Sequence, residues 1–424
     1  MMYALCDVNS MYASCEKVFD PGIRRRPVVV LTNNDGCICS ACGIAKKMGI
    51  GKKFSPYFQM KDELARIGAV IRSSNYELYA DLSQKLMDTC SRFAPHSHIY
   101  SIDELFLYYG KSRAYVPQEG WLAHGLKIRK TVWKEVRLPI SVGIGATCTL
   151  AKCANYAAKK LPGFNGVAVI DNDKIREAVL GQMKVTDVWG IGNRLGRRLN
   201  DAGIYSALQL ARAQPGWIRK QFSIVVENTV HELNGRAKLN WDQVRSPKKE
   251  IYSTRSFGER ITEVEQLKFA LATHAGIAAV KLRKQRSLSK ALVIFANSSP
   301  HDEAGYYRKS VYHHFAVPTN DSCQIMNACS QAVEDIFQTG VRFYRCGVGL
   351  LEISDETCYQ QDLFDVSKDN IKLMACMDKI NARFGRGTSI LAGQGIEQKF
   401  AMRREFLSPQ YTTRWQDIPK IQCE

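Results

Sequence analysis

Long apolar runs are missing from this chain of 424 residues. No stretch approaches the about 18 consecutive apolar residues that a membrane-spanning helix requires. The N-terminus also lacks the uninterrupted apolar stretch of a secretory signal peptide, because Asp7 falls within it. We therefore expect a cytoplasmic protein that has no membrane partner.

Acidic residues are few relative to basic ones. The chain has 41 Asp and Glu against 59 Lys and Arg, which gives a formal net charge of +18. The basic residues are spread through segments that are expected to fold, and they do not form a single tail. This distribution favours a polyanion as the partner.

The 14 cysteines lack the paired spacing of a zinc finger. Cys37, Cys39 and Cys42 form the one dense group, and no second Cys or His pair follows at finger spacing. In a cytoplasmic protein, most cysteines remain reduced and behave as small apolar residues. A zinc site is therefore disfavoured.

Two adjacent carboxylates, Asp103 and Glu104, interrupt an apolar, β-prone run that has no lysine or arginine within it. Unpaired buried charge is costly, and hard divalent cations such as Mg²⁺ prefer carboxylate oxygens. Successive side chains of a strand point to opposite faces. Both carboxylates can therefore serve one site only at a strand end, a turn or a bulge. The alternative is a short acidic turn without a metal.

A third carboxylate strengthens the metal hypothesis. Asp7 lies near the end of another apolar strand, Met2–Val8. Two buried strands would then bring three carboxylates, those of Asp7, Asp103 and Glu104, to one place. Such a set suits a two-metal site for phosphoryl transfer.

Strands and helices alternate through residues 1–170, which predicts an α/β or α+β core. Within it, the glycines of the strand Ser141–Gly145 indicate close approach of another backbone or a ligand. The sequence pattern changes after this core. Val188–Arg194 contains a Gly-Ile-Gly turn before a helix rich in arginine. This pattern resembles a helix-hairpin-helix motif that binds a DNA phosphate, although a simple helix–helix turn is the alternative.

We expect a compact domain in the third quarter of the chain, after a basic linker at residues 236–250. The apolar patterns predict the element order β-α-β-β-α-β, a ferredoxin-like arrangement. His274 lies on the apolar face of the first helix and is expected to be a packed neighbour rather than a ligand. The predicted elements are strand 250–257, helix 262–286, strands 290–297 and 308–316, helix 324–338 and strand 343–353.

These motifs together resemble the Y-family translesion DNA polymerases. The resemblance extends over nearly the whole chain, and the later segments are similar to the UmuC type, which includes the catalytic subunit of bacterial DNA polymerase V and plasmid-borne relatives. The segments that carry it are Cys6–Tyr12, Ser73–Asp81, Tyr100–Glu104, Val142–Gly145, Val188–Gly192, Arg255–Arg260, Gly385–Thr388 and Ser408–Arg414.

The resemblance implies a multidomain α+β fold shaped like a right hand. It has a ferredoxin-like palm, small fingers, a helical thumb with a helix-hairpin-helix motif, and a ferredoxin-like little finger that binds DNA. The implied domains are a palm at 1–33 and 76–171, fingers at 34–75, a thumb at 172–240, a little finger at 241–353, and a C-terminal tail with a clamp-binding peptide at 354–424.

The resemblance also implies the catalytic residues. Asp7, Asp103 and Glu104 match the carboxylates that hold two Mg²⁺ ions against the primer 3′-hydroxyl and the incoming deoxynucleoside triphosphate. A backbone carbonyl of Cys6 or Val8 adds an oxygen ligand.

Three further residues match nucleotide contacts. Tyr12 matches the steric-gate aromatic that excludes a ribose 2′-hydroxyl, and Lys159 and Lys46 match lysines that meet the triphosphate. Ser40–Lys46 departs from the usual Ala-Arg-Asn-x-Glu-Ala-Lys pattern of the fingers. This departure puts the finger contacts in doubt.

Other matches concern DNA and the sliding clamp. A Gln and a Leu-Phe pair in the tail match the peptide that such polymerases insert into the β sliding clamp: Gln360, Leu363 and Phe364. The residues assigned to DNA contacts are Gly190, Gly192, Arg194, Arg197, Lys248, Lys249 and Arg255.

The implied function is error-prone, template-directed addition of deoxynucleotides opposite damaged bases, as part of SOS mutagenesis. The implied partners are a primed DNA template, a cleaved UmuD-type dimer, a RecA filament and the β sliding clamp. One alternative is a catalytically weak scaffold that binds damaged DNA. Another is a nucleotidyl cyclase, which would need neither the hairpin at 190–192 nor the clamp-like peptide.

Overall fold

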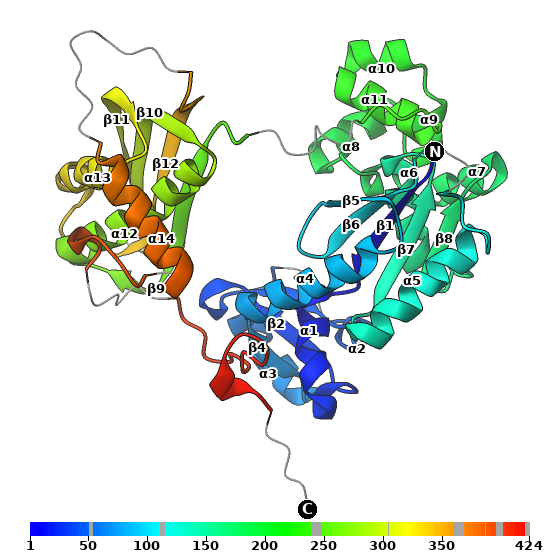
Figure 1. Cartoon of the computed structure of the whole chain (residues 1–424), viewed down its shortest axis with the longest axis horizontal. Coiled ribbons are helices and arrows are strands. Elements are labelled where there is room, and N and C mark those ends of the chain that lie inside the picture. The colour runs from blue at the N-terminus through cyan, green and yellow to red at the C-terminus, as the bar shows by residue number, and fades with distance from the viewer. Residues whose placement is uncertain are drawn as a thin grey trace, which may run out of the picture. The chain divides into compact units, whose positions relative to one another are not determined.

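The structure, a computed structural model, describes residues 1–50, 54–110, 115–239, 247–303, 305–358, 369–385, 387–395 and 402–419. The chain forms two compact units (Figure 1). The first comprises Met1–Arg245 together with Arg404–Glu424, and the second comprises Ser246–Arg403. No helix in the described ranges is long and apolar enough to cross a membrane.

The main sheet of the first unit has β1 at its centre. Strand β1 pairs antiparallel with β6 on one side and with β7 on the other, and β7 pairs parallel with β8. In spatial order the strands are β5 (His96–Ile99), β6 (Glu104–Tyr108), β1 (Tyr3–Val8), β7 (Ile140–Gly145) and β8 (Val167–Ile170).

Helices cover both faces of this sheet, and successive side chains of a strand point to alternate faces, so each strand packs against both layers of helices. Ala4 and Cys6 of β1 belong to the large core that also takes residues of α4 (Tyr76–Ser91) and α5 (Trp121–Glu135). The intervening residues Tyr3 and Leu5 pack with Ala151 of the helix on the other face, α6. Odd-numbered positions of β1 therefore face α6.

Helix α6 (Cys148–Lys160) lies very close to the sheet. A Cβ atom built on Gly143 of β7 would lie 2.1 Å from the backbone nitrogen of Asn155. The glycine expected to admit a close backbone does so, and α6 is that backbone. Thr147 begins the helix, because its Oγ1 accepts a hydrogen bond of 3.1 Å from the backbone N–H of Leu150.

A smaller sheet of the first unit has β2 in the middle and β3 and β4 at its edges. The sequence assigns residues 28–31 to the palm, but β2 pairs with β3 and β4 and not with the main sheet. Periodicity identifies a buried strand without naming its neighbours. The elements are α1 (Met11–Phe19), β2 (Val28–Leu31), β3 (Ile38–Ala41), α2 (Gly43–Lys47), α3 (Tyr57–Arg66) and β4 (Val70–Ser73).

Short helices follow β8, in the range that the family resemblance implies is a thumb. The buried carboxylate of Glu232 accepts hydrogen bonds from the backbone N–H groups of Thr149, Lys238 and Leu239. It therefore connects the end of the thumb to the start of α6. The helices are α7 (Asp173–Gln182), α8 (Asn193–Asp201), α9 (Ala207–Arg212), α10 (Pro215–Gln221) and α11 (Ile224–Leu233).

The second unit has the predicted element order β-α-β-β-α-β. Its antiparallel sheet has the spatial order β11-β10-β12-β9, so each helix connects two strands that have another strand between them. Helices α12 and α13 pack on the sheet in one apolar core. The elements are β9 (Ile251–Ile261), α12 (Val264–Lys284), β10 (Ser287–Asn297), β11 (Arg308–Thr319), α13 (Ser322–Ile336) and β12 (Phe343–Asp355).

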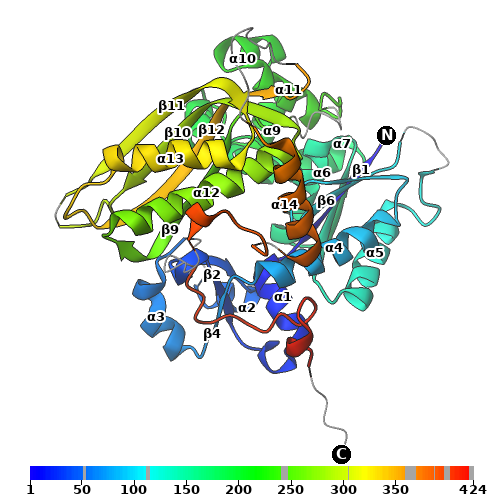
Figure 2. The ribbon, with the colours of Figure 1, turned by 60° about the vertical axis from the view of Figure 1, so that its left-hand side comes forward.

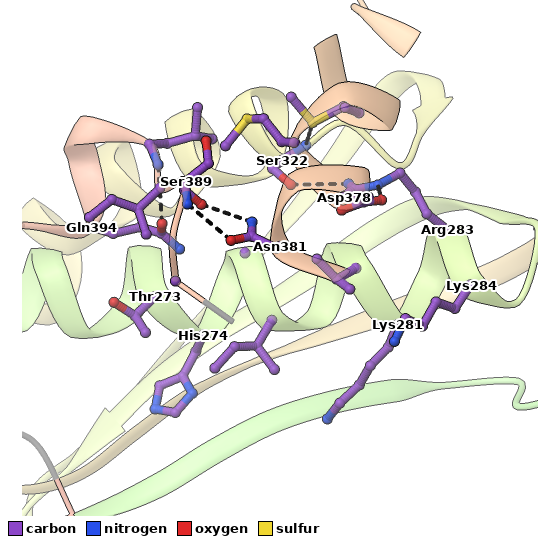
Figure 3. A pocket seen from close by; sticks show the side chains of 18 of the residues that line it. Thr273, His274, Lys281, Arg283, Lys284, Ser322, Asp378, Asn381, Ser389 and Gln394 are labelled. Atoms are coloured by element: carbon purple, nitrogen blue, oxygen red, sulfur yellow. Dashed lines mark hydrogen bonds and ion pairs between the residues drawn. The ribbon is translucent and has the colours of Figure 1, made fainter. Parts of the chain in front are cut away.

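The segment that the sequence treats as one tail contains a helix of the second unit. Helix α14 (Ile371–Phe384) is joined to α12 by a two-pronged ion pair between Arg283 and Asp378, with N–O distances of 2.8 and 2.9 Å. A cavity of about 740 Å³ lies between α12 and residues 387–394 (Figure 3). From Arg404 onward the chain belongs to the first unit again.

Candidate active site

The main sheet brings the predicted carboxylates to one place. Asp7 on β1 and Glu104 on β6 are direct partners in the antiparallel register. Asp103 precedes β6 in the turn after β5, and its carbonyl accepts a hydrogen bond of 3.0 Å from the N–H of Val8. The two adjacent carboxylates therefore lie at a strand end, as the sequence requires.

Two lysines of α6 neutralise the two cross-strand carboxylates. Lys159 Nζ lies 2.5 Å from Asp7 Oδ1, and Lys152 Nζ lies 2.6 Å from Glu104 Oε1. The two lysines are seven positions apart, which places them on one face of the helix. The sequence indicated Lys159 by family resemblance, but the importance of Lys152 was missed although the same spacing signals it.

Aromatic rings surround Lys152. Its Nζ lies 4.6 Å from the ring centroid of Tyr100 and 5.5 Å from that of Trp189. The indole N–H of Trp189 donates a hydrogen bond of 3.2 Å to the Tyr100 hydroxyl. This aromatic arrangement holds the ammonium group of Lys152 beside Glu104 through cation–π contacts.

Burial makes the site unfavourable for free negative charge. The pKa of Asp7 is raised to about 6, chiefly by burial and further by the Glu104 carboxylate, while Lys159 opposes the rise. Asp103 accepts a hydrogen bond of 2.6 Å from Ser101 Oγ. Hard carboxylate oxygens that repel one another fit a divalent cation. Among the described residues, no three Asp, Glu, His or Cys side chains lie close enough together to hold a metal ion.

Tyr12 lies in the first turn of α1, close to the end of β1. Its ring stacks on that of Tyr79 with a centroid separation of 4.7 Å and an interplanar angle of 13°. The ring of Tyr76 meets it edge-on at 5.9 Å. Burial raises the pKa of the Tyr12 hydroxyl to about 12, so the side chain is neutral at physiological pH.

Lys46 of α2 reaches the same region from the fingers. Its Nζ donates a hydrogen bond of 2.8 Å to the side chain of Ser10, two residues before Tyr12. Ser10 has a left-handed backbone with φ of 51° and does not cap α1 with its side chain. The altered finger segment therefore still delivers a lysine to the strand end that carries Asp7.

The predicted hairpin lies before α8. Gly190 has φ of 87°, a conformation that favours glycine, and Gly192 directly precedes the helix. Arg194 and Arg197 are exposed, and neither side chain has a hydrogen bond or ion pair in the described ranges. They are free to meet phosphates.

The remaining predicted contacts belong to the second unit and the tail. Lys248 and Lys249 are exposed before β9. Arg255 on β9 is exposed and lines the cavity beside His274 and Lys281. The predicted clamp-binding residues lie outside the described residues: Gln360, Leu363 and Phe364.

Comparison with known proteins identifies the family. Residues 6–156 match the impB/mucB/samB family, residues 248–363 match its C-terminal domain, and residues 371–421 match a domain of unknown function (DUF4113). Protein UmuC of Salmonella typhimurium is 42% identical over 425 residues, which is 99% of this chain and 100% of that protein. The chain belongs to the UmuC-type Y-family translesion DNA polymerases.

Other UmuC-type relatives agree with this assignment. Protein SamB of Salmonella typhimurium is 41% identical and Protein MucB of Escherichia coli is 39% identical, each over 99% of both chains. This UmuC-type chain is a DNA-directed DNA polymerase of error-prone translesion synthesis that uses a DNA template. Polymerases of this family use deoxynucleoside triphosphates and a divalent metal ion.

Solved structures support the fold. A Y-family DNA polymerase chimera of Dbh and Dpo4 has a TM-score of 0.64 at 19% identity and covers 84% of this chain and 100% of its own. A Dbh ternary complex with the same coverage and identity has a TM-score of 0.53. Palm, fingers, thumb and little finger, predicted from the sequence, are therefore confirmed as the architecture of this UmuC-type chain.

Proposed function

We propose that the UmuC-type chain transfers nucleotides by a two-metal mechanism at Asp7, Asp103 and Glu104. The observation that supports this is the direct cross-strand pairing of Asp7 with Glu104, with Asp103 in the adjoining turn. These side chains, and the Val8 carbonyl, would hold two Mg²⁺ ions. When bound, the ions would supply charge stabilisation for the attacking primer oxygen and the departing pyrophosphate.

In this reaction the primer 3′-oxygen bonds to the α-phosphorus, and the bond from that phosphorus to the pyrophosphate oxygen breaks. Lys159 and Lys46 bind the triphosphate. Lys159 balances the charge of the Asp7 carboxylate. Once bound cations balance that charge instead, the ammonium group of Lys159 can leave Asp7 and bind a phosphate oxygen. Lys152 keeps the Glu104 side chain in place from its aromatic surroundings.

Tyr12 selects the sugar. Its ring is packed between Tyr79 and Tyr76 and therefore cannot turn aside to admit a ribose 2′-hydroxyl. A flat ring fixed by stacking excludes one additional oxygen without needing a hydrogen bond.

The DNA contacts follow the distribution of free basic groups. Gly190 and Gly192 let backbone N–H groups of the hairpin face a phosphate, and Arg194 and Arg197 add charge beside them. In the second unit, Lys248 and Lys249 are the corresponding exposed cations, with Arg255 as a further contact.

The proposed wider assembly is supported by family membership alone. We propose that a cleaved UmuD-type dimer and a RecA filament support activity in SOS mutagenesis, and that Gln360, Leu363 and Phe364 bind the β sliding clamp. The proposed working domains are the palm (1–33 and 76–171, without β2), the fingers (34–75, together with β2, which pairs in the smaller sheet), the thumb (172–240) and the little finger (241–353).

Primer extension past an abasic site tests the catalytic proposal. With Mg²⁺, the UmuD-type dimer and the RecA filament present, Asp103→Asn should lower the rate at least about a thousandfold, because metal-based charge stabilisation contributes several kcal/mol. Asp88→Asn on the exposed side of α4 is the matched control and should retain activity. A full rate in Asp103→Asn would overturn the proposal. Equal DNA binding with no extension by any protein would favour the scaffold.

A further inference from the structure

The C-terminal part of the first unit lies against the fingers and α4. This return segment, Arg404–Tyr411, falls within the match to the domain of unknown function, which gives it no role. In Figure 2 it runs beside β4 and α1. Phe406 pairs with Ser73 at the end of the edge strand β4 through two hydrogen bonds of 3.0 Å.

Ser408 is the most buried contact of the return segment, with 5% of its surface exposed. The Asn75 side chain, which also caps α4, donates hydrogen bonds of 3.0 Å to the carbonyl and to the hydroxyl oxygen of Ser408. The Ser408 hydroxyl donates in turn to Glu16 Oε1 at 3.1 Å. The buried side-chain amide of Asn75 therefore holds Ser408 in place.

Glu16 links the return segment to the nucleotide side of the palm. Its Oε1 atom also accepts a hydrogen bond of 2.6 Å from the Tyr79 hydroxyl, and its other oxygen lies 3.6 Å from Arg72 Nε. Only 2% of Glu16 is exposed. A carboxylate buried to this degree depends on its donors, so the loss of one donor shifts the others.

Tyr79 completes the connection to Tyr12. The Tyr79 ring is fully buried, and its hydroxyl is held by Glu16 at one end while its face lies against Tyr12. A displacement of the hydroxyl end tilts the ring on which Tyr12 stacks. Ser408, Glu16, Tyr79 and Tyr12 therefore form a continuous series of contacts.

We propose that the return segment is a specificity element of the polymerase: Ser408 acts through Glu16 and Tyr79 to position the Tyr12 ring that selects deoxyribose over ribose. Ser408 is a positioning residue, because it touches neither sugar nor phosphate. The inference rests on the proposed role of Tyr12. It assigns the domain of unknown function a part in nucleotide selection.

Single-nucleotide insertion of dCTP and CTP opposite guanine tests the inference, with the full-length chain and its proposed partners present. In Ser408→Ala the ratio of kcat/KM for dCTP to that for CTP should fall about three- to tenfold, since the hydrogen bond from Ser408 to the Glu16 carboxylate is lost. The change should appear as a lower KM for CTP, with kcat for dCTP retained. Ser408→Thr keeps the hydroxyl and should restore the ratio.

Two further variants separate positioning from loss of folding. Tyr79→Phe keeps the stacked ring, removes only the hydroxyl, and should relax the ratio in the same direction. Arg404→Ala removes the exposed ion pair with Glu77, 3.1 Å long, from the same segment and should leave the ratio unchanged. Thermal unfolding shows that each variant is folded.

The Tyr12→Ala background decides the result. If Ser408 acts through Tyr12, Ser408→Ala has no additional effect on the ratio once the ring is absent. An unchanged ratio in both Ser408→Ala and Tyr79→Phe, with a relaxed ratio in Tyr12→Ala, overturns the inference alone. An unchanged ratio in Tyr12→Ala overturns the sugar-selecting role of Tyr12 and the inference with it.

Discussion

At the scale of single residues, His274 is a buried base among cations. It lies on α12 beside the cavity (Figure 3) and is 6% exposed. Its Nδ1 lies 3.0 Å from the Ser253 hydroxyl. Burial, followed by the positive charges of Arg255 and Lys281, lowers its pKa from 6.5 to about 4. His274 is therefore neutral and packed, as its place on an apolar helix face predicts.

This shift predicts acid sensitivity of the second unit. In the unfolded chain His274 binds a proton below about pH 6.5, whereas in the folded unit it does so only near pH 4. Stability is therefore highest above pH 6.5 and falls progressively as the pH is lowered from 6.5 through 4, by about 3 kcal/mol in all. Hydrogen exchange of the β10 amides between pH 7 and 4 should show this loss.

The matched pair of variants is His274→Gln and His314→Gln. The first should flatten the pH dependence, because glutamine does not titrate. The second removes a side chain that is 65% exposed and should leave the pH dependence as in the parent chain. An equally steep fall in His274→Gln would assign the acid sensitivity to other groups.

Some residues of the site could be predicted from the local sequence, and others could not. The positions of Asp7, Asp103 and Glu104 could be predicted, because a carboxylate in or beside an apolar strand is unusual and indicates that something must balance its charge. Lys152 could have been found from its distance of seven residues to Lys159. The contact between Glu16 and Ser408 spans 392 positions and leaves no local signal, because it depends on where the chain returns.

At the scale of elements, α8 combines free and occupied arginines. Arg198 donates to the Gln221 carbonyl at 3.0 Å and lies over the Phe222 ring at 5.2 Å. Arg194 and Arg197, on the same helix, have no such contacts in the described ranges. The helix therefore offers two exposed positive charges without such contacts to described residues and one that is held by the fold.

This difference predicts a specific salt dependence of DNA binding. The double substitution Arg194→Ala and Arg197→Ala should weaken binding of primed DNA and make the plot of log affinity against log salt shallower by about two, since each phosphate contact releases one counterion. Fluorescence anisotropy from low to moderate salt measures the slope. Arg198→Ala should keep the slope while lowering thermal stability. An unchanged slope in the double variant would remove α8 from the DNA interface.

The periodicity of apolar residues predicted which segments form helices and strands, but it did not predict which strands pair with each other. In the second unit β9 was expected at 250–257 and is found at Ile251–Ile261, and α12 was expected at 262–286 and is found at Val264–Lys284. Alternation and helical spacing carry that information. The assignment of β2 to the smaller sheet depends partly on its parallel pairing with β4, about 40 residues later, which no local pattern specifies.

At the scale of the whole molecule, the chain connects its two units twice. It leaves the first unit before Ser246, forms the second, and rejoins the first at Arg404. Family resemblance predicted the domains in order, but it treated the C-terminal part as a tail. The contacts of Phe406 with Ser73 and of Ser408 with Asn75 instead place the residues from Arg404 onward in the first unit.

A truncation after Arg403 should therefore loosen the first unit and leave the second intact. The Ser73 N–H donates to the Phe406 carbonyl at 3.0 Å, and the buried Asn75 side chain loses its partners at Ser408 and Pro409. Hydrogen exchange at the end of β4 and the start of α4 should accelerate at least about tenfold, because these amides open locally. The β10 amides of the second unit serve as the internal control and should keep their rate. Faster exchange in β10, with β4 unchanged, would mean that the return segment stabilises the other unit.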